Sequence, residues 1–241
     1  MDAAPTSRES RTAGRLPGVS LSVVAVALAL RLWPSAVEGL AYLPDTFARG
    51  EWWRLVGCHL AHWSFEHALW DALTFLLVGS WCEAAGRRRM LAATLACAVV
   101  IPPVVLAVQP ELSAYAGLSG LDVALSALLL TRVTRERWHD ASAPLRAALV
   151  VAGGAMVLKL AYEFLAGGLW FVHGYAGDFV PVPLSHLIGG CTGGAVGLLP
   201  ALPKTGDASD DGPRPRRRTM ALGGRAWTIR PSPRAPSARP I

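Results

Sequence analysis

Charge is scarce in this chain of 241 residues, because charged residues make up only 17% while hydrophobic residues make up 52%. The mean hydropathy is +0.36. So little charge cannot coat the surface of an ordinary soluble domain. The same composition disfavours disorder over most of the length. We therefore expect a chain that lives in a lipid bilayer.

Cysteines are also few, and their spacing excludes two classes of small protein. The four residues are Cys58, Cys82, Cys97 and Cys191. They show no paired spacing, which excludes a disulfide scaffold and a zinc ribbon. Since most of them lie in apolar runs, we interpret them as small buried hydrophobic residues.

The net charge of +6 is concentrated in one segment. Nine of the 23 Lys and Arg residues lie after residue 203, in a stretch rich in Pro, Gly and Ser. Such a composition cannot bury enough apolar surface to fold. A basic tail of this kind suits anionic lipid better than nucleic acid. We predict a disordered basic tail over residues 203–241 and no nucleic-acid partner.

Six long apolar runs precede this tail, at about 17–33, 66–82, 90–108, 118–133, 145–165 and 184–200. A helix of sixteen residues rises about 24 Å, less than the roughly 30 Å of a bilayer core, so the shorter runs favour a compact bundle. The predicted fold is all-α, a polytopic bundle of six transmembrane helices over residues 17–202 behind an arm at 1–16. The first run also resembles a secretory signal, but it lacks an A-x-A cleavage site.

Positive charge is distributed unevenly between the two sides of this bundle. With a cytoplasmic amino terminus, ten arginines before the tail lie inside and three lie at or beyond the outer face. The inner ten are Arg8, Arg11, Arg15, Arg87, Arg88, Arg89, Arg132, Arg135, Arg137 and Arg146. The positive-inside rule therefore predicts a plasma-membrane protein with both termini in the cytoplasm.

Ionisable groups inside such spans are costly and indicate function. In the predicted topology His67, Ser119 and His186 each fall within about the first turn of a helix that runs from outside to inside. The three side chains then share one layer near the outer face. A serine and a histidine at one depth on neighbouring helices can act as nucleophile and general base.

Glycines lie close to both of these residues. The stretch Gly117-Leu118-Ser119-Gly120 leaves helix-start N–H groups free to bind an oxyanion. Further glycines follow His186, at Gly189, Gly190, Gly193, Gly194 and Gly197. Small residues at a spacing of four let two helices lie close together. Taken alone, the G-x-S-G string is weak evidence and ordinary helix packing is the better explanation, and the glycine stripe needs no chemistry either.

Together these residues resemble the rhomboid family of intramembrane serine proteases, from about Trp53 to Leu199. In that family a loop Trp-Arg pair precedes the second span, matched here by Trp53 and Arg54. A histidine within that span is matched by His67, and an acidic residue that closes it by Glu83. The nucleophile motif G-x-S-G matches residues 117–120. The base histidine, followed by glycine three and seven residues later, matches His186, Gly189 and Gly193.

The resemblance implies a protease without metal or cofactor that cleaves a membrane-anchored protein near the outer leaflet. Ser119 is then the nucleophile, His186 the base, and His67 a donor to the oxyanion. Residues 51–55 and the Lys159/Glu163 pair look most like the rhombosortase branch, which is implicated in processing carboxy-terminal Gly-Gly sorting tails. The alternatives are an inactive relative that binds transmembrane clients, and a small transporter or channel.

Two positions depart from the family pattern. Asp71 stands where the family usually carries asparagine, and an ionised carboxylate repels an oxyanion. We expect Asp71 either to be protonated or to hold His67 as the donor. Val123 stands where many relatives carry an aromatic residue or histidine. The adjacent Asp122 either orients His186 or pairs with Lys159.

Three further groups receive structural interpretations. Lys159 and Glu163 are four residues apart, and we predict a structural ion pair. Glu83 is expected to anchor a helix end. The trio of His59, His62 and His67 lacks a second acidic cluster and is a poor metal site, with His62 ordering the loop instead.

Overall fold

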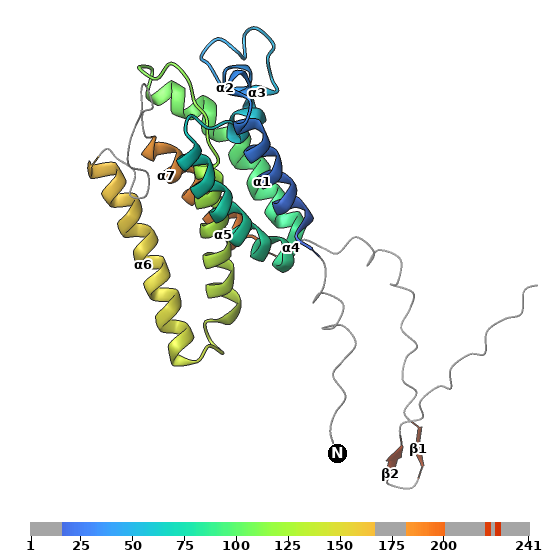
Figure 1. The fold of residues 1–241 in the computed structure, drawn as a ribbon. Coiled ribbons are helices and arrows are strands. Elements are labelled where there is room, and N and C mark those ends of the chain that lie inside the picture. The colour runs from blue at the N-terminus through green and yellow to red at the C-terminus, as the bar shows by residue number, and fades with distance from the viewer. Residues whose placement is uncertain (1–15, 167–181, 201–219, 223–224, 228–241) are drawn as a thin grey trace, which may run out of the picture. The chain divides into compact units, whose positions relative to one another are not determined.

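The computed structural model describes residues 16–166, 182–200, 220–222 and 225–227. The chain divides into two units, Met1–Pro200 and Ala201–Ile241. The described part of the first unit is helical, as Figure 1 shows. Its elements are α1 (Gly18–Arg31), α2 (Pro34–Leu40), α3 (Arg54–Gly57), the 3₁₀ turn η2 (Cys58–Leu60), α4 (Phe65–Val108), α5 (Ser119–Arg137), α6 (Ala143–Ala166) and α7 (Pro183–Leu198).

The long helix α4 contains two of the expected runs. Its backbone leaves the helical conformation at Gly86, with φ 169° and ψ 83°. Figure 1 shows that the two halves of α4 run in different directions. The two halves correspond to the runs expected at 66–82 and 90–108. The turn lies close to α5, because a Cβ at Gly86 would lie 2.8 Å from the Nη1 at the end of the Arg132 side chain.

The described helices differ in their capacity to cross a membrane. By length and composition, α4 and α6 are the two that are long and apolar enough. Helix α1 has 14 residues, which gives a rise of about 21 Å. The expectation of a largely helical protein is confirmed. The number of six crossings and the cytoplasmic position of both termini stay predictions.

Helices α5 and α7 lie against each other with almost no side chain between them. A Cβ at Gly189 would collide with the carbonyl oxygen of Gly120, and one at Gly193 with that of Ala124. A Cβ at Gly197 would lie 2.9 Å from the Thr131 Cβ. The order of these contacts along both helices shows that α5 and α7 run parallel.

Helix α1 is attached to α4 by a carboxylate. Glu83 accepts hydrogen bonds from the backbone N–H groups of Val19 (3.1 Å) and Ser20 (3.0 Å). These groups have no partner within the helix, because the first N–H groups of any helix lack one. Glu83 also lies 3.4 Å from the Arg87 Nε. The helix end that Glu83 stabilises is thus the start of α1.

The segment between α1 and α4 is ordered by Arg54. Its Nη1 donates to the carbonyl oxygens of Glu38 (2.7 Å) and Ala41 (2.8 Å). Its Nε donates to Glu51, and hydrogen bonds from Arg49 and Arg54 hold the pKa of Glu51 below its usual range. This segment is therefore a folded platform beside the start of α4.

The second unit contains a short antiparallel pair, β1 (Met220–Leu222) and β2 (Arg225–Trp227), in which Leu222 pairs with Arg225. The disorder expected over 203–241 stays a prediction. The rest of 203–241 and the arm at 1–15 lie outside the described residues.

Candidate active site

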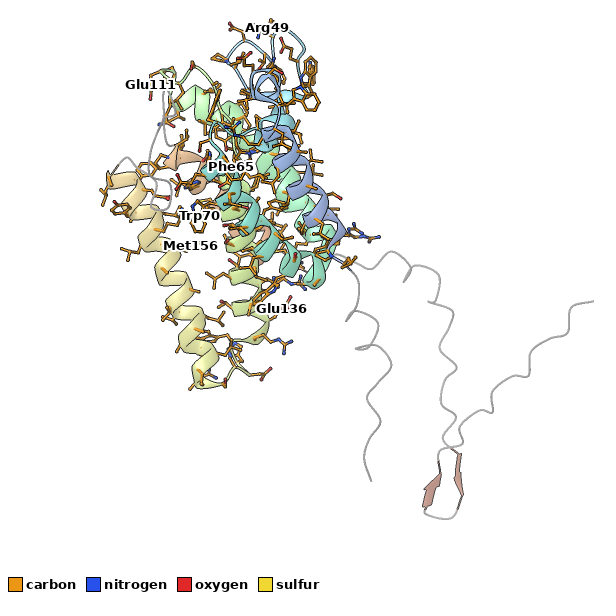
Figure 2. The ribbon with its side chains drawn as sticks, in the orientation of Figure 1. Arg49, Phe65, Trp70, Glu111, Glu136 and Met156 are labelled. Atoms are coloured by element: carbon orange, nitrogen blue, oxygen red, sulfur yellow. The ribbon has the colours of Figure 1, made fainter. Side chains whose placement is uncertain are left out.

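Ser119 lies at the first position of α5 and is half-buried. It lines a cavity of about 510 Å³ whose walls come from α4, α5, α6 and α7. Trp70 on α4 and Met156 on α6, labelled in Figure 2, belong to two of these walls. The serine predicted as nucleophile thus faces a space large enough for part of a peptide.

His186 lies in the first turn of α7 and lines the same cavity. Its side chain is buried, with only 3% of the residue exposed. The close contact of Gly189 with Gly120 aligns the starts of α7 and α5. The structure therefore brings Ser119 and His186, from helices far apart in sequence, to one cavity.

Glu163 on α6 contacts both a lysine and this histidine. Its Oε1 lies 2.7 Å from the Lys159 Nζ, which is the ion pair expected from their spacing. Its Oε2 lies 2.7 Å from the His186 Nδ1. Nothing in the sequence signalled this second contact, because it joins two different helices.

Asp71, one turn after His67 on α4, lies at the centre of a buried polar cluster. Its Oδ2 accepts the Leu118 N–H at 3.1 Å. The same oxygen lies 3.1 Å from the His62 Nε2 and 3.2 Å from the His67 Nε2. Asp71 and His67 are thus neighbours, and the expectation that Asp71 is either protonated or holds His67 as a donor stays a prediction. His62, which we expected to order the loop, contacts the same Asp71 carboxylate.

Gly117 has a backbone conformation that other residues rarely adopt, with φ 127°. Its N–H donates to the Cys58 carbonyl at 2.9 Å. A Cβ at this position would lie 3.0 Å from the His67 Cε1. Glycine is needed here both for the turn into α5 and for the approach of the histidine.

His59 was missed as a contributor to this turn. Its Nδ1 lies 3.1 Å from the Gly117 carbonyl oxygen, and its Nε2 lies 3.2 Å from that of Ala98. Burial lowers the pKa of His59 to about 4. The ring is therefore neutral near pH 7, so it has one N–H and donates to only one of these two carbonyl oxygens.

Gly120 and Asp122 occupy the first turn of α5. Gly120 is buried, and a Cβ there would lie 3.2 Å from the Ser185 carbonyl oxygen on α7. Asp122 is buried and lines the cavity, yet its Oδ1 has no hydrogen-bond partner in the described part of the chain. The carboxylate that bonds to His186 is that of Glu163.

Among the described residues, no group of three or more His, Cys, Asp or Glu side chains is placed to hold a metal ion.

Comparison with known proteins agrees with this arrangement. A family model described as the rhomboid domain matches residues 49–202, which include every residue of the cavity. A comparison with curated proteins finds none that matches the chain. The match covers more than half of the sequence, and the chain therefore belongs to the rhomboid family, whose members are membrane-integral and in general serine proteases that act within the bilayer.

Proposed function

We propose that this protein is an intramembrane serine endopeptidase with Ser119 as nucleophile and His186 as general base. The observation that carries the proposal is the cavity that both side chains line, next to the polar cluster of Asp71 and His67. A Ser/His pair is chemically sufficient for peptide hydrolysis when a base reaches the hydroxyl and donors await the oxyanion.

The reaction follows from these positions. The Ser119 Oγ attacks the peptide carbonyl while its proton passes to the His186 Nε2, and the carbonyl electron pair moves to oxygen. His67 and N–H groups at the start of α5 stabilise this oxyanion. The tetrahedral intermediate then expels the amine, which takes the proton from His186. Water hydrolyses the acyl-enzyme by the same steps, with His186 again acting as base.

The substrate is a membrane-anchored protein segment. The cavity is lined by apolar side chains of α4 and α6, including Trp70, Ala152 and Met156, together with a few polar groups near Ser119. In a bilayer such walls favour an apolar segment that enters between α4 and α6. With both termini in the cytoplasm, cleavage occurs near the outer leaflet of the plasma membrane. The rhombosortase-like features favour carboxy-terminal Gly-Gly sorting tails as the substrate.

One observation favours a second function, that of an inactive relative that binds transmembrane clients. The Leu118 N–H, just before Ser119, already donates to the Asp71 carboxylate. If this contact persists when substrate is bound, the oxyanion loses a donor and gains a neighbouring negative charge.

The test is labelling of the purified protein in detergent by a fluorophosphonate probe, which reacts with an activated serine. We expect labelling of the wild type, none of Ser119→Ala, and full labelling of Ser113→Ala, in which an exposed serine of the preceding loop is removed. Labelling that survives in Ser119→Ala would refute the assignment of the nucleophile. An unlabelled wild type that retains bound membrane segments would favour the inactive relative.

A further inference from the structure

The strongest unassigned contact in the cavity is the one between α6 and α7. Glu163 is almost fully buried, with 1% of the residue exposed. One of its oxygens meets the His186 Nδ1 and the other meets the Lys159 Nζ, each at 2.7 Å. Buried carboxylates are costly unless all their acceptor sites are used well. This one is used entirely by a cation and by the predicted base.

A carboxylate on Nδ1 determines which nitrogen of His186 carries the proton. An ionised carboxylate only accepts hydrogen bonds, and the Glu163 oxygen lies 2.7 Å from the Nδ1, closer than the Lys159 Nζ at 3.5 Å, so the Nδ1 is the protonated nitrogen. In a neutral imidazole the Nε2 is then the acceptor. This is the tautomer that a general base needs in order to take the proton of a serine hydroxyl.

We propose that Glu163 is the positioning residue of a Ser119–His186–Glu163 triad and that Lys159 fixes the orientation of its carboxylate. The inference rests on the proposed function and adds a third member to the Ser/His pair. Glu163 holds the ring of His186 in one orientation and one tautomer. When the proton of Ser119 arrives at the Nε2, the imidazolium forms beside a carboxylate in an environment of low dielectric, where that attraction is strong.

Lys159 completes the charge balance of the resting site. In the proposed resting state the charges of the Lys159–Glu163 ion pair cancel and the general base adds none, so the group has no net charge within the bilayer. After proton transfer, the new positive charge on His186 is matched by the oxyanion. Neither state requires an uncompensated charge among the apolar side chains of α6.

The presence of Lys159 makes Glu163→Gln a specific probe of this role. The glutamine has a single oxygen, and the Lys159 ammonium, which only donates, attracts it. The amide NH₂ then faces the His186 Nδ1, which must become an acceptor, and the proton moves to the Nε2. Glu163→Gln thus favours the wrong tautomer, whereas in Lys159→Met/Glu163→Gln the amide is free to turn its oxygen toward His186.

The experiment measures the rate of fluorophosphonate labelling of Ser119 in four proteins. We expect Glu163→Gln to lower the rate by up to about 10⁴-fold, the size of the loss when the acidic member of a serine-protease triad is replaced by its amide and the histidine takes the wrong tautomer. We expect Lys159→Met/Glu163→Gln to be labelled at least ten times faster than Glu163→Gln. Glu136→Gln is the matched control, because it removes a carboxylate from another i,i+4 pair on the exposed end of α5. Wild-type rates in Glu163→Gln, or an equal loss in the double variant, would overturn the inference.

A second measurement does not depend on catalysis. Nitrogen NMR of histidine-labelled protein reports which ring nitrogen is protonated, and the His186 signals are assigned by their disappearance in His186→Asn. We expect protonation at Nδ1 in the wild type and at Nε2 in Glu163→Gln. If this switch occurs but the wild type is never labelled, the positioning role stands and the protease function fails. If the wild type is labelled but the tautomer does not change, the positioning role fails alone.

Discussion

The Asp71 carboxylate accepts the Leu118 N–H at 3.1 Å, so a residue of α4 occupies a backbone donor that lies one residue before Ser119. The same oxygen also faces His62 and His67. The oxygen accepts a backbone N–H and lies beside two histidine rings, which explains how an acidic residue persists at this buried position. In the proposed mechanism, this carboxylate therefore occupies a backbone donor close to the position where the oxyanion forms.

Replacing Asp71 by asparagine should preserve or raise the rate of fluorophosphonate labelling. The neutral amide does not repel an oxyanion, and its NH₂ group adds a donor to the site. The weaker hydrogen bonds to Leu118 and His62 should lower the free energy of unfolding by about 1–3 kcal/mol. Labelling and thermal unfolding in detergent measure the two effects, with the exposed Asp45→Asn as control. Abolished labelling in a folded variant would show that the reaction needs the carboxylate.

Replacing Gly117 by alanine should damage both stability and activity. An L-residue at φ 127° is strained, at a cost of roughly 1–3 kcal/mol. The new methyl group also pushes against the His67 ring. Gly154→Ala is a matched control, because its Cβ meets nothing within 4 Å on α6. That control should be neutral or slightly stabilising, since alanine favours helix more than glycine does. Equal thermal unfolding of Gly117→Ala and wild type would contradict the geometry of this turn.

Replacing Gly193 by alanine should separate α7 from α5. Its Cβ has no room beside the Ala124 carbonyl, whereas a Cβ at Gly194 lies 3.8 Å from its nearest neighbour, the Thr131 Oγ1. Overpacking of this kind costs about 1–3 kcal/mol. Since His186 precedes Gly193 by two turns, labelling should fall together with the unfolding temperature. Gly194→Ala should keep both. If the two variants behave alike, the close contact of these helices is not what aligns the cavity.

The stability of the protein should decrease in acid partly because of His59. Burial lowers its pKa from the ordinary value of 6.5 to about 4. The unfolded chain therefore binds a proton before the folded chain does, so this contribution is complete above pH 6.5 and is lost as the pH falls toward 4. Unfolding temperatures measured across this window should fall more steeply for the wild type than for His59→Asn. Parallel curves would show that His59 does not titrate in this way.

Local patterns in the sequence predicted much of the architecture. The apolar runs marked the helical segments, because backbone groups in an apolar environment must be satisfied within the helix itself. The position of Ser119 and His186 within about one turn of a helix start followed from the same runs. The glycines after His186 indicated close packing, and the structure identifies α5 as the partner of α7. Periodicity also suggested the Lys159/Glu163 pair, since its members lie on one helix.

The sequence alone thus determined that this is a helical, bilayer-suited chain with a serine and a histidine at the starts of two helices. The tertiary structure decided which groups surround them. The Glu163 carboxylate contacts His186, the Asp71 carboxylate accepts the Leu118 N–H, and the His59 ring contacts the Gly117 carbonyl oxygen. Each of these contacts joins segments at least 23 residues apart. Such contacts depend on the rotation and depth of one element against another, and local spacing carries no information about either. Packing of side chains between elements supplies that information, and it exists only in the folded chain.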